Sequence, residues 1–145
     1  DVLERSIVNP DDAEALREHV RVGAEIAREL PRKEIASMIL WHHERYDGGG
    51  YPDGLSEEAI PLGARVIALA EAVESMVSGA FPHSSPVPSD TIVSNVLAEK
   101  GRAFDPGVVD AFLRVLEGGS LELAATVDQE KGIMRPPRFG ESPAR

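Results

Sequence analysis

Two adjacent histidines, His42 and His43, are the side chains in this chain best suited to chemistry. They come at the end of an apolar run, residues 35–41, which predicts a helix over about residues 32–45 with both rings leaning toward a buried pocket. Neutral imidazole is a good ligand for iron, manganese, zinc or nickel. The alternative is a helix that ends at a turn, with the histidines as polar residues at the edge of the core.

A glycine-rich loop follows the histidines directly. Residues 47–52 read Asp-Gly-Gly-Gly-Tyr-Pro, ending in Tyr51 and Pro52. Glycine allows backbone angles closed to other residues and lets a ligand approach closely, and proline stiffens the exit from the loop. Histidines joined to such a loop indicate a ligand site. Tyr51 is either part of such a site or simply packs the turn.

Composition limits the classes of protein that fit. The chain has 145 residues, enough for one domain with a real core. It has no cysteine, so any metal must be held by His, Asp or Glu, and a reducing cytoplasmic setting fits best. The formal net charge of -10 argues against a nucleic-acid polymer as the main partner but not against a small phosphate ligand at a local metal. No apolar run reaches membrane-spanning length.

Helical spacing and capping residues predict an all-α bundle of about five main helices, since no segment shows the alternation of a strand. The helices are expected over about residues 11–30, 32–45, 61–78, 90–100 and 106–117, with a helical turn at Glu57-Glu58. Asp105 and Pro106 have the types expected of an N-cap and a first helical residue. The domain is expected to occupy residues 1–127, with residues 128–145 as a flexible tail.

Two helix faces carry further candidate ligands. His19 lies on an apolar or small-residue side of the first helix, where a histidine bonded to a backbone carbonyl is the alternative. Glu71 lies on a partly polar face of the third helix, where an ordinary solvated face is the alternative. The expected inward residues are Leu16, His19, Gly23, Ile26 and Leu30 in the first helix, and Leu62, Val66, Leu69, Val73 and Met76 in the third.

Residues 42–55, His-His-Glu-Arg-Tyr-Asp-Gly-Gly-Gly-Tyr-Pro-Asp-Gly-Leu, resemble the HD-GYP family of bacterial metal-dependent phosphohydrolases that cleave cyclic di-GMP. The likeness extends over about residues 2–116; its central block is highly specific and its flanks match in pattern only. It implies an HD-domain-like helical bundle and a signalling phosphodiesterase for cyclic di-GMP or a related cyclic dinucleotide. The alternative is a degenerate module that recognises a ligand or a signalling protein through the Gly-Tyr-Pro loop without turnover.

The resemblance assigns roles to particular residues. It implies two divalent ions, iron, manganese or similar, which together can activate a water, so no protein nucleophile is needed. The implied metal ligands are His19, His42, His43 and, where the family has aspartate, Glu71; the implied substrate residues are Gly50, Tyr51, Pro52 and Arg65. We expect the three histidines to lie within about 8 Å of one another, as a bimetal site requires. We expect an ion pair between Arg65 and an acidic loop residue.

The chain also departs from the family pattern. The family's His-Asp pair and a more N-terminal histidine are absent, and the segment after Ser78 lacks an arginine and a lysine that the family offers to phosphates. Either the chain is a fragment or the domain has lost half of its metal site; a start at Asp1, without Met, favours a fragment. We therefore expect the 145-residue chain alone to bind metal weakly and to be inactive.

Overall fold

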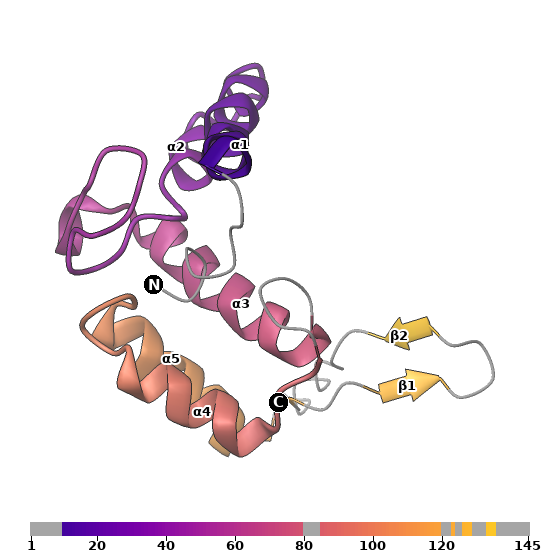
Figure 1. Ribbon diagram of the computed structural model, residues 1–145. Helices are drawn as coiled ribbons and strands as arrows, with labels where there is room; N and C mark the ends of the chain where they lie inside the picture. Colours follow the sequence, from indigo (N-terminus) through magenta and orange to yellow (C-terminus); the bar gives the residue numbers. More distant parts are fainter. Residues whose placement is uncertain (1–9, 80–84, 120–122, 124–125, 129–132, 136–145) are drawn as a thin grey trace.

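The computed structural model describes residues 10–79, 85–119, 123, 126–128 and 133–135 (Figure 1). Helices dominate these residues, as predicted, and a single 3-10 turn, Glu57–Ala59, confirms the expected turn in the loop region. The helices are α1 (Pro10–Arg28), α2 (Glu34–Leu40), α3 (Leu62–Ser78), α4 (Ser89–Ala98) and α5 (Pro106–Glu117).

Two short strands follow the helices; a short helix or strand was expected over residues 121–127, and no strand was expected after residue 128. Strand β1 (Thr126–Asp128) pairs antiparallel with β2 (Ile133–Arg135), with Val127 opposite Met134. Part of the predicted flexible tail thus forms β2, while the rest of residues 129–145 lies outside the described part of the chain. Both strands lie apart from the helical bundle (Figure 1).

Helices α1 and α2 form a close pair through small side chains. The buried residues on α1 are Val20, Ala24 and Ala27, and Ala36 is buried on α2. Gly23 makes the approach possible, because a Cβ atom there would stand 2.9 Å from Ile39 Cγ2. Gly23, which was expected on the inward side of the first helix, does face α2.

The buried face of α1 differs from the predicted one by one helical step. Ile26 and Leu30 were expected inside, yet they are 68% and 45% exposed. Helices that pack closely need small residues at the contact, so α1 turns its alanines toward α2 and leaves its larger apolar side chains outside. His19 consequently stands at the exposed edge of the pair rather than inside it.

The main core lies between α3, α4 and α5. Its central residues on α3 are Leu69, Val73 and Met76, as predicted. Nearer the start of α3 the prediction was wrong: Leu62 and Val66 are exposed and Ala64 is fully buried. The remaining members of the core cluster are Val77, Ile92, Val96, Val109 and Leu123.

The ends of the later helices follow the predicted local chemistry. The Asp105 side chain accepts hydrogen bonds from the Gly107 and Val108 amides, and Pro106 is the first residue of α5. Gly79 ends α3 in a left-handed conformation (φ 67°), which costs glycine little. Gly101 follows α4 at φ 76°. Capping residues therefore fix these boundaries well.

The second helix is shorter than predicted. It ends at Leu40, and residues 41–43 form a turn that carries His42 and His43. Trp41 in this turn and Glu44 directly after it hydrogen-bond to the loop that follows: Trp41 Nε1 donates to Asp53 Oδ2 at 2.8 Å, and Glu44 accepts from loop amides. These contacts replace continued helix, so both histidines lie just beyond it.

Candidate metal centre

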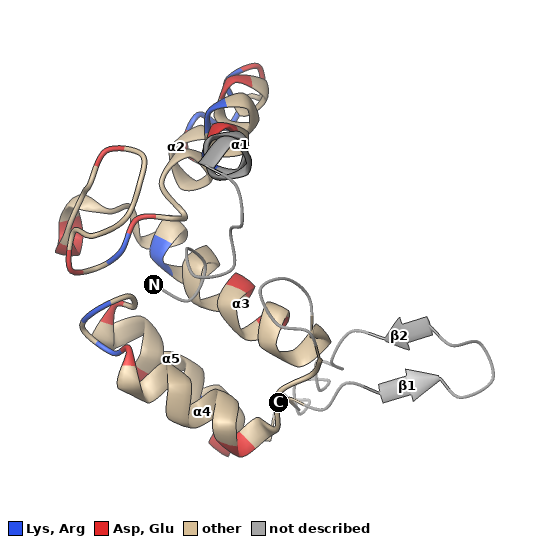
Figure 2. Cartoon of the chain, viewed as in Figure 1, with Lys and Arg blue, Asp and Glu red and all other residues tan. Residues whose placement is uncertain are grey.

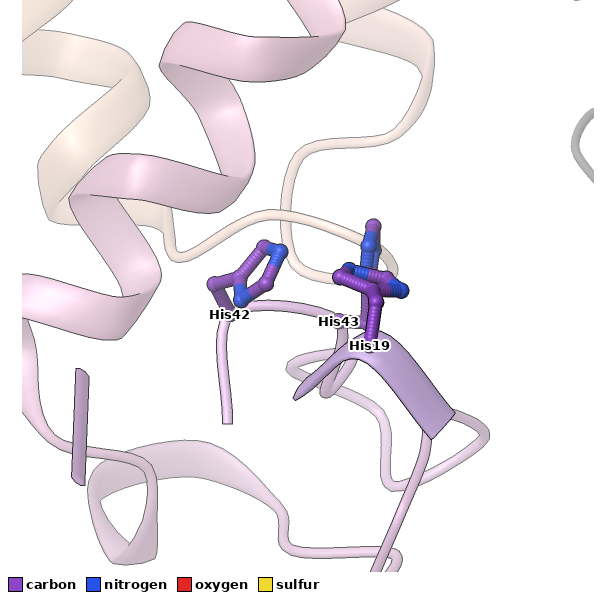
Figure 3. Close-up of side chains that lie close together, drawn as sticks. All are labelled: His19, His42 and His43. Carbon is purple, nitrogen blue, oxygen red and sulfur yellow. The ribbon is translucent and has the colours of Figure 1, made fainter. Parts of the chain in front are cut away.

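Three histidine rings come together where α1 passes the turn after α2 (Figure 3). The ring centroids of His19 lie 5.5 Å from His42 and 5.1 Å from His43, and those of His42 and His43 are 4.1 Å apart. The predicted convergence within about 8 Å is confirmed. One nitrogen from each ring lies within 4.8 Å of the others.

His42 is held in an orientation that suits a ligand. Its Nδ1 lies 2.6 Å from the Ile39 carbonyl oxygen. Because that oxygen can only accept, Nδ1 carries a proton, and in the neutral ring the lone pair then lies on Nε2. A backbone carbonyl on the second ring nitrogen is a common way to fix a metal-binding histidine. The side chain of His42 is only 11% exposed, which limits alternative rotamers.

His43 is kept neutral by its surroundings. Burial first, and then the charges of His42 and His19, lower the pKa of His43 from its ordinary 6.5 to about 3. Its ring is therefore unprotonated at neutral pH. A neutral imidazole has a nitrogen lone pair available for a divalent ion, so His43 is in the form that binds metal at neutral pH.

Glu71 brings a carboxylate to the same place from α3. Its Oε2 lies 3.6 Å from His42 Nε2 and 4.0 Å from His43 Nε2. The Glu71 side chain is 51% exposed, so it can still rotate. The structure thus brings together all four residues predicted as metal ligands, and their role as ligands stays a prediction.

The donor set fits a divalent ion. Metal–nitrogen bonds of about 2.1 Å allow two ligand nitrogens to stand at most about 4.2 Å apart, so a small rotation of the rings brings the three histidines within reach of one ion. The Glu71 carboxylate completes a mixed nitrogen and oxygen set of the kind that borderline metals accept. A second ion of the implied pair would need ligands beyond these four.

The Gly-Tyr-Pro loop packs directly on the cluster. The Tyr51 ring stacks on His43, with 4.9 Å between centroids and 27° between planes, and the Tyr51 amide donates to the His43 carbonyl at 3.2 Å. Gly50 has no room for a side chain, since a Cβ would lie 2.3 Å from Arg45 N and 2.6 Å from His43 O. Gly50, Tyr51 and Pro52 are therefore beside the site, as predicted; Tyr51 packs the turn in this arrangement.

Glu44 holds the Gly-Tyr-Pro loop in place through hydrogen bonds to its backbone. It is 4% exposed, and its Oε1 accepts from the amides of Asp53 at 2.7 Å and Gly54 at 3.0 Å. Its other oxygen, Oε2, is buried and has no hydrogen-bond partner among the residues that the structure describes. The carboxylate next to the two histidines thus orders the loop that covers His43.

Two arginines tie the loop region to the rest of the domain. Arg45 hydrogen-bonds Asp47 at 3.0 and 2.8 Å and Glu99 at 3.3 Å; the hydrogen bond with Arg45 lowers the pKa of Asp47 below its ordinary value. Arg65 pairs with Asp105, which confirms the expected ion pair with an acidic loop residue. Its guanidinium is engaged there, so the substrate contact implied for Arg65 stays untested.

Two residues with clear contacts at the site were missed in the sequence. Glu44 belongs to the quoted motif, and a carboxylate inside a block of buried, glycine-rich sequence is a sign of a structural acceptor. Arg17, two residues before His19, lies with its guanidinium carbon 5.6 Å from the centre of the Tyr51 ring. Nothing in its spacing along the chain connects it with a residue 34 positions later. The fourth histidine of the chain, His83, was not predicted as a ligand and lies outside the described residues.

Comparison with known proteins agrees with this geometry. A family model described as HD domain matches residues 2–108. The chain is 40% identical over 116 residues to the cyclic di-GMP phosphodiesterase response regulator RpfG of Xanthomonas campestris, a match that covers 78% of this chain and 30% of that protein. It is 33% identical over 117 residues to a cyclic di-GMP phosphodiesterase of Thermotoga maritima, covering 79% and 32%.

A solved structure gives the same picture. The crystal structure of the cyclic GMP-AMP specific phosphodiesterase V-cGAP3 of V. cholerae superposes with a TM-score of 0.62 at 29% identity, over 75% of this chain and 25% of that one. The chain therefore belongs to the HD domain family, and the resemblance to HD-GYP phosphohydrolases is confirmed. It spans a third or less of the length of these relatives. None of the described helices is long and apolar enough to cross a membrane.

Proposed function

We propose that the chain is part of a metal-dependent phosphodiesterase domain that hydrolyses a cyclic dinucleotide in bacterial signalling. The observation that carries the proposal is the convergence of His19, His42 and His43, with one nitrogen of each within 4.8 Å of the others. The relatives support it, because they are named as phosphodiesterases for cyclic di-GMP or for 3'3'-cGAMP. Since both substrates occur among them, the proposal names the class and leaves the two open.

The residues of the chain have distinct tasks in this proposal. His19, His42, His43 and Glu71 would hold divalent metal, iron, manganese or similar, and a pair of ions is proposed from the family pattern. Metal bound there supplies a Lewis acid for the phosphate and a means to activate water. Tyr51, stacked on His43, marks the side on which a base can lie. Glu44 keeps that loop in place through two amide hydrogen bonds.

The test is hydrolysis under single-turnover conditions, with the manganese-loaded chain in excess over cyclic di-GMP or 3'3'-cGAMP. Single turnover detects slow cleavage, which matters because we expect weak metal binding and little steady-state activity from these residues alone. Cleavage that His42→Ala and His43→Ala abolish would support the enzyme. Chromatography of the products separates linear dinucleotide from intact substrate.

The same experiment addresses the alternative function. A chain that binds the cyclic dinucleotide in calorimetry but never cleaves it would be a degenerate recognition module, with the Gly-Tyr-Pro loop as the surface for a ligand or a signalling protein. A chain that neither binds nor cleaves either nucleotide, although it holds manganese, would contradict both. The named activities of the relatives favour the enzyme.

A further inference from the structure

A cavity of about 300 Å³ lies between α1, the end of α2 and the Gly-Tyr-Pro loop. Its apolar lining is made by Ala24, Leu40 and Pro52. Two arginines and two carboxylates make up the rest of its wall: Arg21, Glu25, Arg28 and Asp53. None of the predicted metal ligands lines this cavity, so it is a place distinct from the histidine cluster.

The charged groups of the cavity differ in what they already contact. Arg28 forms an ion pair with Glu25. Asp53 accepts a hydrogen bond from Trp41 Nε1 through Oδ2 at 2.8 Å, which leaves Oδ1 able to accept another. Arg21 is exposed and makes no hydrogen bond or ion pair with another residue that the structure describes. The cavity therefore offers a ligand the donors of one guanidinium and an acceptor of one carboxylate.

The charge and size of the cavity limit the kind of ligand that it fits. Its two positive and two negative side chains balance, and residues of both signs occur along α1 and around the loop (Figure 2). A metal ion or a lone phosphate favours a wall with an excess of the opposite charge, whereas a neutral ring with both donors and acceptors does not. The volume is at the lower end of the range for small-molecule sites, so it suits one ring system and not a whole cyclic dinucleotide.

We propose that this cavity binds a guanine base. Guanine presents two neighbouring acceptors, O6 and N7, which an arginine can contact together, and it presents N–H donors to a carboxylate on its next edge. Arg21 and Asp53 supply these two partners, and the apolar residues of the lining supply a surface for the ring. Adenine has an amino group where guanine has O6, so its donors would face the donors of the guanidinium.

The proposed base would contact the loop that packs on the histidine cluster. Pro52 and Asp53, which line the cavity, directly follow Tyr51, and the Tyr51 ring stacks on His43. The base can belong to the proposed cyclic dinucleotide substrate or to a free guanine nucleotide, since both carry the same ring. The site uses none of the predicted metal ligands, so it can be tested without metal.

The first test titrates GMP and AMP into the isotope-labelled, chelator-treated chain and follows the indole N–H signal of Trp41 by NMR. Trp41 is the single tryptophan of the chain, and its indole nitrogen donates to Asp53 in the cavity wall, so this signal reports on the proposed site. The two nucleotides carry the same phosphate and differ in the base. GMP should move the signal to saturation with an affinity roughly tenfold higher than that of AMP, the discrimination expected of one paired arginine contact.

Variants at Arg21 separate recognition from charge and from folding. Arg21→Ala should reduce the preference for GMP over AMP to less than about twofold, and Arg21→Lys should give an intermediate preference, because an ammonium group lacks the planar pair of donors. Arg32→Ala is the control, since its side chain is 77% exposed and lies outside the cavity, and it should keep the wild-type preference. The midpoint of thermal unfolding should be unchanged in Arg21→Ala, because Arg21 is exposed.

Cyclic di-GMP, titrated into the same chelator-treated chain, identifies the source of the base. Binding that depends on Arg21 and is at least as tight as that of GMP would assign the cavity to a base of the cyclic dinucleotide. Weaker binding than that of GMP would assign it to a free guanine nucleotide. Either result supports a guanine site.

Three results would overturn the guanine site. They are a Trp41 signal that no guanine nucleotide moves, equal affinities for GMP and AMP, and a preference for GMP that Arg21→Ala leaves intact. Because these titrations contain no metal, they do not depend on hydrolysis. Failure of the proposed phosphodiesterase activity and failure of the guanine site are therefore observed separately.

Discussion

Single side chains hold the histidine cluster in a form that suits the proposed metal. The Ile39 carbonyl fixes the proton of His42 on Nδ1, and burial lowers the pKa of His43 so that its ring is neutral. Both effects cost the metal-free chain something, since an oriented ring loses rotational freedom and a buried imidazole loses hydration. Binding of a cation repays these costs, which is typical of a site ordered in advance for its ligand.

Glu71 allows a matched test of the proposed ligand set. Its carboxylate lies 3.6 Å from His42 Nε2, and Glu74, one turn later on α3, offers a second exposed glutamate on the same helix as a control. We expect Glu71→Gln to weaken manganese binding roughly tenfold, because it removes a negative oxygen from the donor set. Glu74→Gln should change it less than about twofold. Competition with a fluorescent chelator measures both, and equal affinities would remove Glu71 from the site.

Glu44 is expected to matter for stability more than for chemistry. Glu44→Ala would leave the amides of Asp53 and Gly54 without their acceptor, at a cost of about 1–3 kcal/mol in the free energy of unfolding. Glu44→Gln keeps an oxygen in the same place, so its cost should be clearly smaller. Urea titration followed by Trp41 fluorescence compares the two. Equal costs would mean that the negative charge, and not the acceptor, holds the loop.

Part of this site could be read from the sequence and part could not. The adjacent histidines, the glycine loop and the family resemblance together located four side chains that do meet in space. Arg17 and the role of Glu44 depend on contacts between segments far apart in the chain, and neither residue type nor spacing carries that information. Arg65 shows the same limit, since only the fold shows that its guanidinium is occupied by Asp105.

Among the elements, the loop after α2 depends on backbone packing at Gly50. A methyl group there would collide with backbone atoms of His43, Glu44 and Arg45, at 2.3–2.6 Å, and backbone cannot easily move aside. At Gly23 the nearest atom is a side-chain methyl of Ile39, 2.9 Å away, which can shift. Replacing each glycine by alanine therefore tests whether the backbone around Gly50 is as rigid as the contacts suggest, with Gly23 as the comparison.

We expect Gly50→Ala to lower the free energy of unfolding by roughly 3 kcal/mol, the upper end of ordinary overpacking. Gly23→Ala should have a much smaller effect, because strain against Ile39 is offset by the roughly 0.5–1 kcal/mol that alanine gains over glycine inside a helix. Urea unfolding of both variants gives the comparison. Similar midpoints for the two would show that the loop can move away from the histidines.

Helix boundaries were easier to predict than helix faces. Asp105, Pro106, Gly79 and Gly101 act through local backbone geometry, so their positions along the chain suffice. The inward face of α1 was misplaced because hydrophobic spacing favours large side chains, while α2 packs against small ones. The end of α2 was missed because it depends on hydrogen bonds from Trp41 and Glu44 to a loop about ten residues away.

For the molecule as a whole, the site lies between two packed groups. Helix α1 and the turn after α2 supply the histidines. Helix α3, which belongs to the larger core with α4 and α5, supplies Glu71. Metal that binds histidines from one group and a carboxylate from the other would therefore link them. Ligands that bind only the folded state raise its stability, so manganese should raise the unfolding temperature and a chelator should reverse the rise.

Protons should lower the stability of the folded chain, whereas metal should raise it. In the metal-free chain, kept so by chelator, the folded pKa of His43 is lowered to about 3 while the unfolded value is 6.5. Between these values the unfolded chain binds a proton that the folded chain refuses, so stability is full above about pH 6.5 and falls as pH drops toward 3. The pKa of Asp47 is lowered by its hydrogen bond with Arg45, so its stabilising effect is complete above its ordinary pKa of 3.8. It changes the slope of stability against pH only below that value.

We therefore expect the free energy of unfolding to decline from pH 6.5 to 4 with a slope that His43→Gln reduces by up to one proton, because glutamine does not titrate. Urea unfolding at half-unit pH steps measures this slope in both proteins. The window from pH 6.5 to 4 separates His43 from Asp47, since the carboxyl contributes only at lower pH. An unchanged slope in His43→Gln would mean that His43 takes up its proton in the folded chain, and hence that its ring is open to water and not sealed beneath Tyr51.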